Sequence, residues 1–141
     1  MKFAMAALAA LFLFASGAQK SNHAVCRAKP PMLCNVFAKI DDSLSSKEKE
    51  TLRDTPASEL IKFHFSFGAT LRQWFHLWSQ NDLTRYFRSL GVSHPEIMSD
   101  MLTRAYVQYL NGQEVNLPAM SRAAMPPPPP PEPPGYRPHG L

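Results

Sequence analysis

The fold is decided by residues 55–78, which read TPASELIKFHFSFGATLRQWFHLW. Large apolar side chains recur there every three or four residues, at Leu60, Phe63, Phe67, Leu71, Trp74 and Trp78. At 100° per residue these positions fall within about 60° of one another, which predicts an amphipathic helix at the centre of the domain. Thr55 and Pro56 suit its first turn, and Gly68 in its middle predicts a kink or break.

Shorter helical patterns flank this stretch on both sides. Further helices are expected over residues 36–44, 46–53, 80–90 and 95–110. Ser45 and Glu48 have the spacing of a capping box, and Ser79 is positioned to cap the helix that follows it. No alternating strand pattern occurs. The sequence therefore predicts an all-α fold, a small domain of four or five helices over residues 36–117.

Composition limits the classes of function. The chain has 141 residues, with 15 Lys and Arg against 11 Asp and Glu, which fits one domain with appendages. No run of five or six like charges occurs, so the basic stripe of a nucleic-acid-binding protein is missing. Phosphate-loop, serine-nucleophile and zinc-protease motifs are missing too. We therefore expect no nucleic-acid partner and no cofactor.

Residues 1–18 have the order of a secretory signal peptide. Lys2 precedes an apolar stretch, and Ser16 and Ala18 fit the small-residue positions of a cleavage site after Ala18. Only 16 apolar or small residues end at Ala18, whereas roughly 20 are needed to span a bilayer. Cleavage is therefore expected rather than an uncleaved anchor. The expected product is secreted or periplasmic, with no stable membrane insertion.

Cys26 and Cys34 predict a disulfide, because they are an even pair in an oxidising compartment. The bridge would clamp an irregular arm over residues 19–35. The alternative is a metal site that adds His23, but the spacing C-x7-C lacks the closely spaced cysteines of zinc sites. We expect the disulfide and no metal.

Residues 118–141 are expected to form a disordered proline-rich tail. Nine prolines lie between Pro126 and Pro138. They forbid a helix and favour an extended polyproline II rod. Such a tail is either a spacer or a docking ligand.

The predicted domain resembles a family of small, uncharacterised bacterial domains of unknown function. The resemblance rests on Thr55-Pro56, Glu59-Leu60-Ile61, Phe63-His64-Phe65, Gly68, Leu71-Arg72, Leu77-Trp78, Leu83, Tyr86-Phe87, Gly91, His94-Pro95 and Met98-Ser99. The chain departs from the family pattern at residues 73–76 and at Glu96-Ile97. The resemblance implies a helical fold and a bacterial source, and it implies no activity, substrate or cofactor.

Two histidines could carry chemistry. His64 lies at the edge of the apolar stripe, where an imidazole is either a ligand or acid/base group or, more commonly, a core histidine bonded to a backbone carbonyl. His94 precedes Pro95 at a helix start, where it is either a cap or a general base.

Arg72, Trp74, His76 and Trp78 place a cation, an imidazole and two indoles within seven residues. Exposed together, they would form a recognition surface. The helical periodicity instead assigns Trp74 and Trp78 to the core side and points Arg72 and His76 away from it. The sequence leaves both interpretations open.

The leading hypothesis is a non-catalytic interaction domain that binds a protein or envelope component, with the tail as spacer or docking segment. The alternative is a small envelope enzyme that uses His64 or His94 with an acidic partner such as Asp82 or Glu96. An enzyme should gather polar side chains in one concave pocket, whereas a binding module should expose an aromatic patch.

Overall fold

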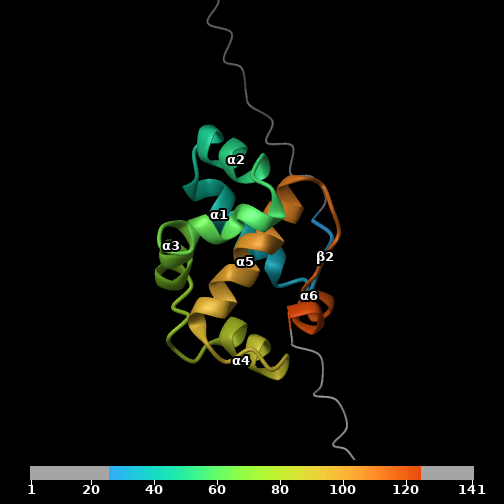
Figure 1. Ribbon diagram of the computed structural model, residues 1–141. Coiled ribbons are helices and arrows are strands. Elements are labelled where there is room, and N and C mark those ends of the chain that lie inside the picture. Colours follow the sequence, from blue (N-terminus) through green and yellow to red (C-terminus); the bar gives the residue numbers. More distant parts are fainter. Residues whose placement is uncertain (1–25, 125–141) are drawn as a thin grey trace, which may run out of the picture.

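The computed structural model describes residues 26–124, which form seven helices and one pair of short strands (Figure 1). In chain order the elements are β1 (Ala28–Lys29), α1 (Leu33–Ser43), α2 (Ser46–Arg53), the 3-10 helix η1 (Ala57–Phe63), α3 (Phe67–Trp74), α4 (Asp82–Ser89), α5 (Pro95–Leu110), β2 (Val115–Asn116) and α6 (Leu117–Ala124). The prediction of a helical fold is confirmed.

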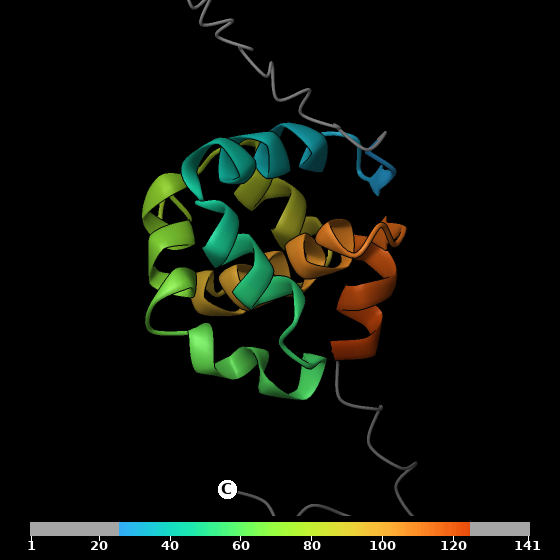
Figure 2. The same ribbon diagram turned by 90° about the horizontal axis from the view of Figure 1, so that it is seen from above.

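Helix α5 is the central element of the domain. It runs through the middle of the molecule in both views, with the other helices around it (Figures 1 and 2). Its buried side chains include Met98, Leu102, Ala105 and Tyr106, each with no exposed surface. The prediction that residues 55–78 form the central helix is wrong. Those residues do not form one continuous helix, because the chain breaks twice.

The first break falls at residues 64–66, between η1 and α3. A break near Gly68 was expected, and it is confirmed. Gly68 itself is buried in the first turn of α3, where an added Cβ would lie 3.6 Å from Ser99 Oγ of α5. An added Cβ would therefore make an ordinary van der Waals contact with α5.

The second break follows Trp74, where α3 ends. His76 has a φ of 47°, in the left-handed region, and residues 75–78 form turns. The 100° periodicity does not extend past Trp74, so Trp78 leaves the apolar stripe. Trp78 was assigned to the core side, and this is corrected: 66% of its surface is exposed.

Two helix starts differ from the sequence prediction. Ser45 and Glu48 form the expected capping box of α2. Helix α4, by contrast, is capped by Asn81, whose side chain accepts a hydrogen bond from the Thr84 N–H at 2.9 Å, and not by Ser79. Thr55 does not cap η1, because its hydroxyl donates to the Thr51 carbonyl at 2.7 Å.

The start of the described chain pairs with the short strand that precedes α6. β1 pairs in parallel with β2, with Ala28 opposite Val115. Two residues are too few to leave an alternating pattern, so these strands were not predicted. Helix α6 was not predicted either, because Pro118 reads as a helix breaker. It stands in the first turn of α6, where a proline is tolerated. Part of the segment assigned to the tail is therefore helical.

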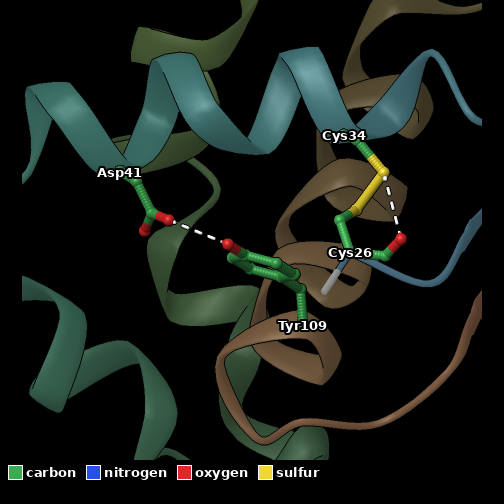
Figure 3. Close-up of a disulfide and its surroundings, with 4 residues drawn as sticks. All are labelled: Cys26, Cys34, Asp41 and Tyr109. Atoms are coloured by element: carbon green, nitrogen blue, oxygen red, sulfur yellow. Dashed lines mark hydrogen bonds between the residues drawn. A yellow bond between two sulfur atoms is a disulfide. The ribbon is translucent and has the colours of Figure 1, made fainter. Parts of the chain in front are cut away.

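A disulfide joins Cys26 to Cys34, as expected (Figure 3). It ties the segment before β1 to the first turn of α1. Both cysteine sulfurs are in the disulfide. Residues 26–124 hold no cluster of His, Cys, Asp and Glu that could bind a metal ion. His23, the predicted signal peptide and the proline run lie outside the described residues. Within residues 26–124, no helix is long and apolar enough to cross a membrane.

Candidate functional site

Four large apolar side chains stand exposed within residues 26–124. Phe65 is 88% exposed, Trp78 66%, Ile61 60% and Ile97 49%. Two of them follow from the breaks in residues 55–78: Phe65 lies in the turn between η1 and α3, and Trp78 lies after α3 ends. The remaining two project from η1 and α5.

All four border the same exposed edge of α5. This edge carries His94, Ile97 and Asp100, which are spaced three residues apart. The Trp78 ring lies 5.9 Å from the His94 ring, nearly perpendicular to it. At the other end, Ile61 lines a small depression together with Asp100. We call this surface the α5 face, made up of Ile61, His64, Phe65, Trp78, His94, Ile97 and Asp100.

His64 connects Phe65 to this edge. Its Nδ1 lies 2.8 Å from Asp100 Oδ1, and its ring meets the Phe65 ring edge-on at 4.8 Å. The break at residues 64–66 directs His64 against α5. His64 therefore pairs with a carboxylate and not with the backbone carbonyl of an ordinary core histidine.

Arg72 holds this arrangement together from α3. Its Nη1 donates to Ser99 Oγ at 2.8 Å, and its Nη2 donates to the His64 carbonyl at 3.3 Å. Ser99 is buried and donates in turn to the Glu96 carbonyl. Arg72 thus links α3, α5 and the turn at His64, and its donors are directed inward.

His94 caps α5. Its Nδ1 accepts a hydrogen bond from the Glu96 N–H at 3.4 Å, which requires a ring nitrogen without a proton. The Glu96 carboxylate is 3.9 Å from the same nitrogen. Asp82, the other acidic partner considered, pairs with Arg85 instead. The acidic partner of His64 is Asp100, which sequence reasoning missed because 36 residues separate the two.

The residues proposed as a recognition surface do not lie together. Trp78 is on the α5 face, while Arg72 is partly buried behind it. Trp74 is half-buried and lines a cleft between α2 and α3. His76 is exposed in the turn after α3. Phe65, Ile61 and Ile97 were not singled out from the sequence, because the helical period assigned the first two to an apolar side.

A second polar cluster lies at Asp41. Its carboxylate accepts hydrogen bonds from the Tyr106 hydroxyl at 2.7 Å and the Tyr109 hydroxyl at 3.0 Å (Figure 3 shows the latter). Burial and, to a smaller extent, the Asp41 carboxylate raise the pKa of Tyr109 to about 12 and raise that of Tyr106 further. Lys49 Nζ lies 3.4 Å from Asp41 Oδ1. This cluster joins α1, α2 and α5.

No histidine lines the depression beside Asp100 or the two larger hollows described within residues 26–124. The depression beside Asp100 has a volume of about 10 Å³, too small for a substrate. A cleft of about 490 Å³ lies between α2, η1 and α3, and is mainly apolar. The α5 face therefore offers exposed aromatic and aliphatic surface bordered by two polar pairs, which suits recognition of another surface better than enclosure of a small molecule.

The comparisons with known proteins identify the family alone. The family model described as "Domain of unknown function (DUF6794)" matches residues 30–110, and the chain belongs to this family. No curated protein and no solved structure matches the chain.

Proposed function

We propose that this family member is a non-catalytic interaction domain, which binds a protein component of the cell envelope through the α5 face. The observation that carries the proposal is the gathering of four exposed apolar side chains, with Phe65 at 88% and Trp78 at 66% exposure, along one edge of α5. Scattered exposed apolar residues are ordinary on a protein surface, whereas a group rimmed by polar residues is typical of an interface.

Burial of these exposed apolar side chains by a partner is energetically more favourable than their exposure to solvent. Fully burying one large apolar side chain contributes roughly 1.5 to 3 kcal/mol. Trp, Phe and Tyr anchors of this kind commonly dominate protein interfaces. The Phe65 and Trp78 rings each also meet a neighbouring histidine ring edge-on.

The site of action is part of the proposal. Export after removal of residues 1–18 agrees with the Cys26–Cys34 disulfide, which persists in oxidising compartments. The intact mass of the exported protein checks it: loss of residues 1–18 is expected, and a product that retains Met1 would contradict it. The proline-rich tail then either spaces the domain or docks it. Another stiff segment of similar reach should restore function if the tail is a spacer, whereas neither that segment nor a flexible Gly/Ser tail should restore it if the tail is a docking ligand.

Site-specific photo-crosslinking tests the α5 face directly. A photoreactive residue is placed at Ile97 in the full chain, and at Gln113 as a matched exposed position outside the face. We expect one envelope protein to crosslink from position 97 and not from position 113. The double substitution Phe65→Ala with Trp78→Ala should abolish the crosslink and leave the melting temperature nearly unchanged, because both side chains are largely exposed. Equal crosslinking from both positions, or none from position 97, would overturn the proposal.

A second candidate function rests on one observation, the 2.8 Å contact between His64 Nδ1 and Asp100. A carboxylate in this position fixes the tautomer and leaves Nε2 as a base. The enzyme hypothesis therefore uses His64 with Asp100. Hydrolysis of model esters by the full chain, lost in His64→Gln, would favour it, and equal rates for both proteins would reject it. The small volume of the adjacent depression makes it the weaker candidate.

A further inference from the structure

A hollow between η1, α5 and α6, here called the α6 hollow, lies apart from the α5 face. Its volume is about 730 Å³, which is within the range of small-molecule sites in proteins. Its apolar lining includes Leu60, Val107 and Met120, and the first two of these belong to the buried core. Arg104 and Gln108 of α5 add polar groups. This combination suits a small molecule that has both an apolar and a polar part.

Arg104 is the one charged residue among those of the described chain that line the α6 hollow. Its Nη1 donates to the Ala57 carbonyl at 3.3 Å, which connects the guanidinium to the start of η1. Arg104 makes no salt bridge to any residue within 26–124. A guanidinium presents a planar fork of donors that matches the two oxygens of a carboxylate. The hollow therefore favours a ligand with one carboxylate.

The acidic groups of the neighbouring segments do not neutralise Arg104. No aspartate or glutamate of residues 26–124 lines the α6 hollow. Those close to its segments in the sequence each lie within 3.7 Å of a partner outside the hollow, in the pairs Asp54–Arg53, Glu59–Lys62, Asp100–His64 and Glu114–Lys29. The charge of Arg104 is therefore available to an anionic ligand.

Carboxamides make up a second group of polar side chains in the lining. Gln108 and Gln113 both line the α6 hollow, and the Gln113 N–H donates to the Gln108 carbonyl at 2.9 Å. This backbone hydrogen bond holds the two residues close together. A carboxamide has both a donor and an acceptor, so it matches the C=O and N–H of a peptide group. A ligand that suits these side chains carries an amide beside its carboxylate.

We propose that the α6 hollow binds a short peptide by its terminal carboxylate. Arg104 pairs with the carboxylate, and Gln108 and Gln113 form hydrogen bonds with the adjoining peptide group. The last side chain of the peptide is apolar and contacts Leu60 and Val107. Capture of a terminal carboxylate is a recurring mode of peptide recognition. In this hollow a side-chain guanidinium binds the carboxylate.

A titration followed by NMR tests the site in the full chain. The two probes are the tripeptide alanyl-alanyl-leucine and the same tripeptide with a carboxamide in place of its carboxylate. We expect the backbone signals of residues 108, 113 and 123 to shift, and those of α4 to stay unchanged. The wild type should bind the free acid about tenfold more tightly than the carboxamide, because a charge-assisted pair is lost in the latter.

Substitution of Arg104 shows whether this preference comes from the proposed contact. Arg104→Gln should bind both probes equally and as weakly as the wild type binds the carboxamide. Arg122→Gln is the matched control, because it removes the same charge from an exposed position of α6 outside the lining. It should keep the full preference. Ala123→Phe, which places a ring in the hollow, should weaken binding of both probes.

Three results would overturn the proposal. They are equal binding of the two probes by the wild type, an unchanged preference for the acid in Arg104→Gln, and the absence of shifts around the hollow at millimolar peptide. The α4 signals of each variant report whether its fold is intact, so a misfolded variant is recognised directly. The α6 hollow and the α5 face share no residue, so this proposal and the proposed function can fail separately.

Discussion

Asp41 shows how one side chain can join three helices. It stands on α1, its carboxylate accepts from Tyr106 and Tyr109 of α5, and it lies 3.4 Å from Lys49 of α2. Tyr106 has no exposed surface. Its hydroxyl donates to Asp41, and this carboxylate satisfies the buried donor.

Removal of this acceptor should destabilise the fold. Asp41→Ala leaves a buried hydroxyl without a partner, so we expect a loss of about 1 to 3 kcal/mol in the free energy of unfolding. Tyr106→Phe removes the hydroxyl itself, so no buried donor is left without an acceptor. The loss in the free energy of unfolding should therefore be smaller. Asp42→Ala, at the exposed neighbouring position, is the control with no expected effect. Urea denaturation measures all three, and equal stability of Asp41→Ala and Asp42→Ala would contradict the prediction.

The same cluster predicts a sensitivity to alkaline pH. Burial and the Asp41 carboxylate raise the pKa of Tyr109 to about 12 in the folded protein, whereas a tyrosine in an unfolded chain has a pKa of about 10. Below pH 10 both states keep the proton, and this contribution to stability is complete. Between those two values the unfolded state loses the proton first, so stability falls as the pH rises.

Tyr109→Phe should remove part of that decline. The urea midpoint of the wild type should fall more steeply between pH 10 and 11.5 than that of the variant. Tyr86→Phe serves as the comparison, because Tyr86 lies on α4 and makes no hydrogen bond to Asp41. Parallel curves for the wild type and Tyr109→Phe would show that Tyr109 titrates at its ordinary value in the folded state.

At the scale of elements, α2 and α4 begin at N-cap residues that make different numbers of hydrogen bonds. Ser45 caps α2 through hydrogen bonds to Glu48 alone. Asn81 caps α4, and its Nδ2 also donates to the Phe75 and His76 carbonyls at 3.1 and 3.2 Å. Asn81 therefore fixes the turn that ends α3 as well as the start of α4.

Substitution by alanine should rank these caps. Ser45→Ala is expected to cost about 1 kcal/mol. Asn81→Ala should cost about 2 kcal/mol or more, because it removes the cap and two further hydrogen bonds. Ser79→Ala should be nearly neutral, because Ser79 contributes its carbonyl, and not its hydroxyl, to the Thr84 hydroxyl. Thermal denaturation checks the order, and a larger loss in Ser79→Ala than in Asn81→Ala would refute the assignment of the cap.

At the scale of the whole molecule, the segment at the start of the described chain pairs with a segment that follows α5. The disulfide and the β1–β2 pairing bring the start of the described chain to β2, just before α6. Val115 and Leu117, on either side of Asn116, are almost completely buried. The segment around β2 is therefore part of the core of the described residues.

Deletion after Ala124 should leave this unit folded. The removed segment contains Met125, Tyr136 and Leu141 as its large apolar residues, and its prolines lack the N–H groups that helices and sheets need. Helix content and melting temperature should be nearly unchanged. A drop of many degrees would mean that the prolines pack against the helices.

The sequence by itself determined the local features of this protein. The capping box at Ser45, the helix over residues 95–110 and the Cys26–Cys34 disulfide follow from groups within a few residues of one another. Such contacts depend on spacing along the chain, which a sequence displays directly. The helical class and the break near Gly68 follow from the same kind of evidence.

Tertiary structure alone decided where those local elements end and which distant residues they contact. Periodicity placed Trp78 in the core, but the turn after Trp74 exposed it, because packing against α5 and the Asn81 side chain ended the helix there. The pairing of His64 with Asp100 spans 36 residues, and it exists because α5 crosses the break at residues 64–66. Both the α5 face and the cleft between α2, η1 and α3 are made by segments that are distant in the sequence. The positions of such segments follow from burial of the whole core rather than from the spacing of residues within any one helix.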